Sequence, residues 1–107
     1  MPSAVIDVEL ILIRLSGPRR AARTAPNAAL VADIVWAVAP IEAGLEHVTA
    51  RPGPLPNTID LALFLSTGGA HPARTALGLC DRAVGTAPVL SGWTAAMLAP
   101  DCPPTER

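Results

Sequence analysis

Residues 45–66 read LEHVTARPGPLPNTIDLALFLS, and no other segment constrains the architecture as strongly. From Ile59 to Leu65, every second residue is isoleucine or leucine. Alternation of this kind is typical of a β-strand with one buried face, so residues 58–66 predict a strand. Residues 45–51 predict a second strand, and the proline-rich segment 52–57 predicts a stiff turn. The stretch is therefore expected to form a β-hairpin.

Near the N-terminus, residues 4–15 also alternate with period two, which predicts another strand. One face of this strand would hold Ile6, Val8, Leu10 and Leu12. The other face would hold Asp7, Glu9, Ile11 and Ile13. Because both acids lie on one face, we expect that face to be open and the purely aliphatic face to be buried.

Two helices are predicted, one on each side of the hairpin. Residues 27–39 form the first, which begins at Pro26 or Asn27 and ends before Pro40. Its core stripe is expected at Leu30, Ile34, Val38 and Ile41, flanked by Val31 and Val35. The opposite stripe (Ala29, Asp33 and Trp36) carries one charge, fewer than a solvent-facing stripe normally has.

The second helix is expected over residues 72–84, with Pro72 in its first turn and Cys80 on its buried face. Residues 89–98 fit either a final strand or a short helix, and we favour the strand. Residues 99–107 hold three prolines and two acids, so we expect a proline-rich tail there. The predicted organisation is one α+β domain at residues 1–98, followed by that tail.

The order strand–helix–strand–strand–helix–strand, over residues 4–98, resembles the ferredoxin-like plait. This resemblance implies an antiparallel sheet in the order 4-1-3-2 with both helices on one face. Plait proteins differ widely in activity, so the resemblance implies no particular function.

The open face of such a sheet holds the best polar candidates. His47 is a candidate general base, with Asp60 or Glu9 as the carboxylate that orients it. The alternative, which we favour, is ordinary charge pairing across strands. The same face would expose Ile11, Ile13 and Phe64, which an open sheet rarely leaves in water. We therefore expect these three residues and Trp36 to bind a partner.

Arginines are the weaker ligand candidates. Arg19, Arg20 and Arg23 precede the first predicted helix, where free backbone N–H groups favour anions. Arg51 on the open face is a further candidate anion ligand. The alternative for the loop arginines is a solvated surface, and we favour it.

Composition excludes several classes of function. The net charge is −1, so the chain has no general attraction for nucleic acids or acidic membranes. Cys80 and Cys102 lie in no metal-binding spacing, so no metal site is expected, and no cofactor motif is present. Whether these cysteines are free or bridged stays open. Without a visible signal peptide, a cytoplasmic protein is expected.

These observations together favour a small non-enzymatic accessory or interaction protein. It is expected to form a homo-oligomer, such as a homodimer, or to bind another protein. The open sheet face or the Trp36 stripe would supply the contact. The alternative is a small cofactor-free enzyme, similar to plait-type monooxygenases and cyclases, that uses His47 with Asp60 or Glu9.

Overall fold

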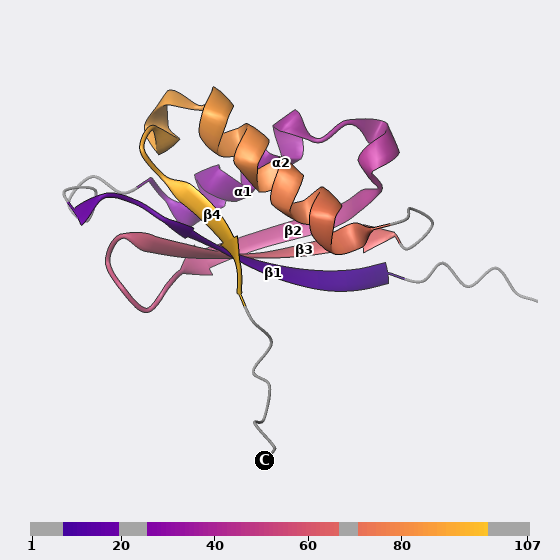
Figure 1. Ribbon diagram of the computed structural model, residues 1–107, viewed down its shortest axis with the longest axis horizontal. Helices are drawn as coiled ribbons and strands as arrows, with labels where there is room; N and C mark the ends of the chain where they lie inside the picture. The colour runs from indigo at the N-terminus through magenta and orange to yellow at the C-terminus, as the bar shows by residue number, and fades with distance from the viewer. Residues whose placement is uncertain (1–7, 20–25, 67–70, 99–107) are drawn as a thin grey trace, which may run out of the picture.

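The computed structural model describes residues 8–19, 26–66 and 71–98, which form two layers (Figure 1). One layer is an antiparallel sheet of β1 (Val8–Ser16), β2 (Leu45–Pro52), β3 (Thr58–Ser66) and β4 (Thr94–Met97). The other holds α1 (Ala28–Val38), α2 (Pro72–Thr86) and the short 3-10 helices η2 (Ile41–Ala43) and η3 (Pro88–Leu90). The α+β class, with four antiparallel strands and two helices, is confirmed.

The strand order is β2-β3-β1-β4, which reads 4-1-3-2 from the opposite edge. Both helices cover the same face of the sheet, and no described helix covers the other (Figure 1). The central strands are β3 and β1. The leucines and isoleucines on their helix-facing side build the core together with Val31 and Val35 of α1 and Cys80 of α2.

The two faces of β1 are the reverse of the prediction. Ile11, Ile13 and Leu15 are 6%, 0% and 0% exposed. The residues that we expected in the core are instead 45%, 49% and 37% exposed, namely Val8, Leu10 and Leu12. The β1–β3 register explains the difference, since it pairs Ile13 with buried Leu61 and so turns the odd-numbered residues towards the helices.

Glu9 misled the face assignment because it lies near the end of the strand. Glu9 is on the helix side and pairs with Leu65, yet it is exposed. A terminal side chain reaches water from either face, so its charge does not report which face is buried. Asp7 lies outside the described residues.

The first helix begins as the sequence predicts. The Asn27 side chain accepts a hydrogen bond from the Ala29 N–H at 2.7 Å, a standard N-cap contact. The core stripe, however, is centred on Val31 and Val35, both fully buried. Leu30, predicted to face the core, is 45% exposed, and Ile41 lies beyond the helix and is 98% exposed.

Residues 89–98 contain both of the structures predicted as alternatives, a short helix and a strand. The 3-10 helix η3 ends at Leu90, and β4 then pairs with β1 through Ile13–Met97 and Ser16–Thr94. The Leu98 N–H still donates to the Leu12 carbonyl at 3.0 Å. The residue two positions later in the sequence is proline, which has no N–H for the next such bond. The β4 ladder is therefore short.

Trp93 packs in the core, with 4% of its surface exposed, between η3 and β4. Its indole lies directly against the backbone of Gly17, at the end of β1. A Cβ at Gly17 would be 2.7 Å from Trp93 Cζ2, closer than real contacts allow. Glycine is therefore required at position 17, because the indole approaches its backbone closely. Trp93 is buried, so it is not an exposed side chain available for contact with a partner.

Candidate functional site

The sheet face opposite the helices is the candidate functional site. Its side chains form three rows that cross β1, β3 and β2 in that order. We call these the apolar row (Leu10, Phe64, His47), the middle row (Leu12, Ala62, Thr49) and the charged row (Arg14, Asp60, Arg51). In the described part of the chain, no helix shields them from solvent (Figure 1).

The apolar row exposes large hydrophobic side chains. Leu10 is 49% exposed, and its neighbour on the same face of β1, Val8, is 45% exposed. The His47 and Phe64 rings lie beside them with centroids 5.8 Å apart and planes tilted by 43°. This end of the sheet is therefore an apolar patch in which the histidine ring acts mainly as a packing surface.

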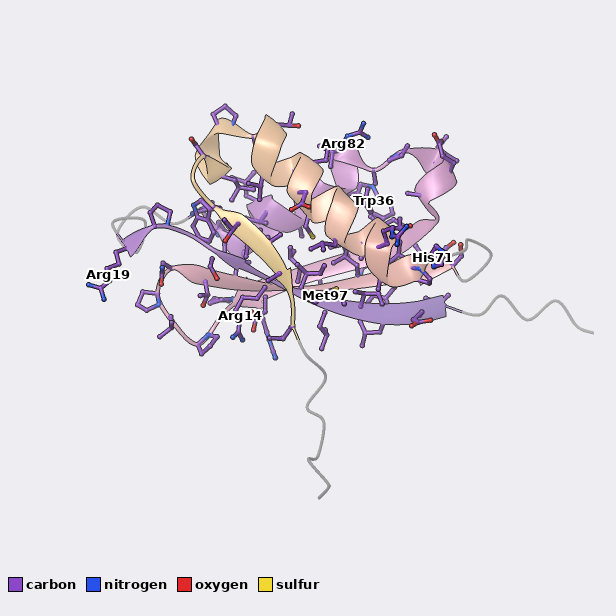
Figure 2. All side chains as sticks on the ribbon, in the orientation of Figure 1. Arg14, Arg19, Trp36, His71, Arg82 and Met97 are labelled. Carbon is purple, nitrogen blue, oxygen red and sulfur yellow. The ribbon has the colours of Figure 1, made fainter. Side chains whose placement is uncertain are left out.

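The charged row contains the one ion pair found among the described residues. Arg14 Nε donates to Asp60 Oδ1 at 2.7 Å, and Arg14 Nη2 donates to Asp60 Oδ2 at 3.0 Å. Arg14 projects from the sheet on the side away from the helices (Figure 2). The hydrogen bond from Arg14 is the main reason that the pKa of Asp60 is lowered, and the same bond raises the pKa of Arg14.

Sequence reasoning missed Arg14, because the wrong face assignment of β1 placed it under the helices. Arg51 lies opposite Asp60 on β2, while Thr49 lies opposite Ala62. The sequence did contain a signal for the open face of β1. Arg14 lies between two aliphatic residues of the strand, and a single arginine in that position must point to the open side.

The ion pair predicts a specific pH dependence of stability. Because folding lowers the pKa of Asp60, its stabilising contribution is present above the unfolded value of about 3.9 and is lost as the pH falls through the folded value. We expect the difference in free energy of unfolding between wild type and Asp60→Asn to be constant from about pH 7 to 5 and to shrink below about pH 4. Urea titrations across this range measure it.

Comparing the two proteins at each pH removes the titration of all other groups, which they share. A difference that stays constant down to about pH 2 would show that Asp60 is not stabilised as a carboxylate.

A hollow of about 280 Å³ lies over the middle and charged rows. Its walls come from β1, β2, β3 and the segment after β4, and they include Leu12, Thr49, Arg51, Asp60, Ala62 and Leu98. Ala62 is the shortest side chain of the middle row, which explains why the surface dips between the larger groups on either side.

The structure does not assemble the predicted histidine–carboxylate pair. His47 lies opposite Phe64, and Asp60 is four residues away along β3. Four residues of strand span about 13 Å, far beyond hydrogen-bond reach. Glu9 lies on the opposite face of the sheet, and Asp60 is already bonded to Arg14. Neither of the two predicted carboxylates therefore orients His47 as a general base.

The predicted partner-binding residues divide into two groups. The prediction that Ile11 and Ile13 bind a partner is wrong, because the register of β1 with β3 turns both side chains into the core. Phe64 lies on the open face, and Trp36 is 51% exposed on the helix layer (Figure 2). Whether the latter two contact a partner stays a prediction.

Of the predicted anion ligands, Arg51 lies in the charged row and Arg19 is exposed after β1. Arg20 and Arg23 lie outside the described residues. Cys80 is fully buried, and burial raises the pKa of its thiol to about 12, so it is protonated at neutral pH and is not a nucleophile. Cys102 lies outside the described residues.

Two further features are absent from residues 8–19, 26–66 and 71–98. These residues contain no group of three or more His, Cys, Asp or Glu side chains that would hold a metal ion. They also contain no helix with the length and apolar character needed to cross a membrane.

The open sheet face thus combines an apolar patch, a bidentate ion pair and a hollow with an arginine beside it. These features suit binding more than acid–base chemistry. Comparison of the chain with protein-family models, curated proteins and solved structures gave no match.

Proposed function

We propose that this protein, a ferredoxin-like plait by its element and strand order, is a non-enzymatic association protein that forms a homodimer through its open sheet face. One observation carries the proposal. Val8, Leu10 and Leu12 expose 45%, 49% and 37% of their surfaces on a face that no described helix covers. A contiguous apolar patch of this kind is typical of a protein interface.

Two obstacles disfavour association through the sheet edges and so favour the uncovered face as the interface. At the β2 edge, the pairing with β3 is irregular between Leu45 and His47, and the strand ends in Pro52. Bulges and prolines are two common means of blocking edge-to-edge pairing. Antiparallel pairing of β1 with a second β1, centred on Glu9, would place two carboxylates opposite each other. Packing of the faces avoids both obstacles.

The size of the face also fits a second copy. Strands of eight and nine residues, spaced about 4.8 Å apart, give a flat footprint of roughly 400 Å². This footprint is about half of the roughly 800 Å² per partner of a standard interface, and projecting side chains add to the accessible area. The face is too small for a large obligate interface, so we expect a dimer that dissociates in the micromolar range.

A two-fold arrangement suits the distribution of side chains. If the apolar rows of two copies meet, Leu10 and Phe64 pack on their own counterparts, and the charged rows stay near the rim. Apolar centre and polar rim are the usual layout of a protein interface. The competing surface is the Trp36 stripe, where a groove of about 400 Å³ also includes the exposed Ile41.

Sedimentation equilibrium of three variants tests the choice between these surfaces. We expect wild type to be dimeric at about 100 µM and Leu10→Asp to be monomeric, because a carboxylate in the centre of the interface loses its hydration. Trp36→Ser and Ile41→Asp, both on the helix layer, serve as matched controls and should leave the dimer intact.

Circular dichroism of each variant establishes that it is folded before its mass is interpreted. A wild-type protein that is strictly monomeric at about 100 µM would refute the homodimer. Dissociation by Trp36→Ser but not by Leu10→Asp would move the interface to the helix layer.

A further inference from the structure

We infer that the hollow on the open sheet face is a binding site for a small monocarboxylate with an apolar body. This inference goes beyond the homodimer. All the residues that line the hollow come from one chain, so the site is complete in a monomer, in which no second copy covers the open face. Three properties of the hollow support it: the charge beside it, the apolar surface within it and its size.

The charge beside the hollow favours an anion. The charged row holds two guanidinium groups, of Arg14 and Arg51, and one carboxylate, of Asp60. Arg14 bonds both oxygens of that carboxylate, at 2.7 and 3.0 Å. The Arg51 side chain lines the hollow and lies opposite Asp60, on whose carboxylate its charge also acts, but it has no hydrogen bond to any residue within 8–19, 26–66 and 71–98. The row therefore carries one net positive charge, with Arg51 as the available donor.

The type of donor narrows the class of anion. A guanidinium presents two parallel N–H groups that match the two oxygens of a carboxylate. Arg51 is exposed, so an anion reaches it from solvent without prior rearrangement. A ligand with an amine in place of the carboxylate would meet the net positive charge and be repelled.

The rest of the hollow is suited to a hydrocarbon group. Leu12 and Leu98 lie beside the short side chain of Ala62, and Thr49 contributes a hydroxyl at the β2 side. The volume of about 280 Å³ is just below the range of about 300–1,000 Å³ that is typical of small-molecule sites. A single ring or short chain therefore fits, whereas a nucleotide does not.

The probe for the experiment is 3-phenylpropionate, with 3-phenylpropanol and 3-phenylpropylamine as matched compounds that share its apolar body. We expect the carboxylate to bind with a Kd of roughly 0.1–1 mM and the other two at least tenfold more weakly. Amide chemical-shift changes in a titration followed by NMR report both affinity and location, and they should centre on Thr49, Arg51 and Ala62.

Substitutions test the charged part and the apolar part of the site separately. Arg51→Gln should weaken binding of 3-phenylpropionate at least tenfold, and Ala62→Leu should abolish it by filling the hollow. Arg74→Gln, an exposed arginine on α2, is the matched control and should leave the affinity unchanged.

Equal affinities for the acid, the alcohol and the amine would overturn the inference, as would an unchanged affinity in Arg51→Gln. The Leu10→Asp variant keeps this result distinct from the homodimer, because a monomer that still binds 3-phenylpropionate supports the site alone. A folded, monomeric Leu10→Asp variant that shows no shifts up to about 10 mM ligand would refute the site and leave the homodimer standing.

Discussion

Replacing Ile13 by aspartate is expected to unfold the protein. Ile13 is 0% exposed and lies on the central strand β1, beneath the helices. A carboxylate there has no polar partner among the core residues, and burying an unpaired charge costs several kcal/mol. Since a domain of this size is stabilised by only about 5–15 kcal/mol, this single change removes most or all of the margin. Far-UV circular dichroism and urea titration measure the loss.

Leu12→Asp is the matched control, because it makes a similar change one residue earlier in the same strand. Leu12 is 37% exposed on the open face, so a carboxylate at this position stays hydrated. We expect the free energy of unfolding, measured at a concentration where the protein is monomeric, to change by less than about 1 kcal/mol. If Leu12→Asp unfolds the protein and Ile13→Asp does not, the faces of β1 are those predicted from the sequence alone.

Trp93→Ala is expected to lower the free energy of unfolding by about 3–5 kcal/mol, the usual range for deleting a large buried aromatic side chain. Trp93 is 4% exposed and holds the η3–β4 segment against the end of β1. Urea titrations followed by circular dichroism avoid the loss of one of the two tryptophan fluorophores. A change below about 1 kcal/mol would show that the indole is not packed in the core.

The contact of Trp93 with Gly17 gives this prediction an internal control. Gly17→Ala should cost about 1–3 kcal/mol in the wild-type background, because the added methyl group overlaps the indole. In the Trp93→Ala background the same change should cost almost nothing. A double-mutant cycle measures this coupling. Equal costs in both backgrounds would mean that the methyl group is disfavoured by the backbone at Gly17 and not by the indole.

Much of the fold followed from local patterns in the sequence. Alternating leucines placed β3 at residues 58–66, where the structure has it. The Asn27 cap and the run of apolar residues after it placed α1 within one residue of its observed ends. Such features depend on near neighbours along the chain, so a single sequence reveals them.

The candidate site was only partly predictable, because local patterns do not report contacts between residues far apart in the chain. His47, Arg51, Asp60 and Phe64 do share the open face, because the alternation of β2 and β3 is clear. The bidentate partner of Asp60, however, comes from β1, a strand 46 residues earlier in the chain. Within β1 the local signals conflict, because Arg14 indicates the even-numbered face as the open one, whereas Glu9 indicates the odd-numbered face.

The sequence by itself determined the elements, their order and the α+β class, because periodicity, capping residues and prolines act over a few residues. Only the tertiary structure decided which face of β1 is buried. Both faces of that strand are aliphatic, so the difference arises from the register with β3 that places Ile13 beside Leu61. That register also brings Arg14 to Asp60 and leaves Leu10 exposed, and it therefore sets the surface proposed to bind a second copy.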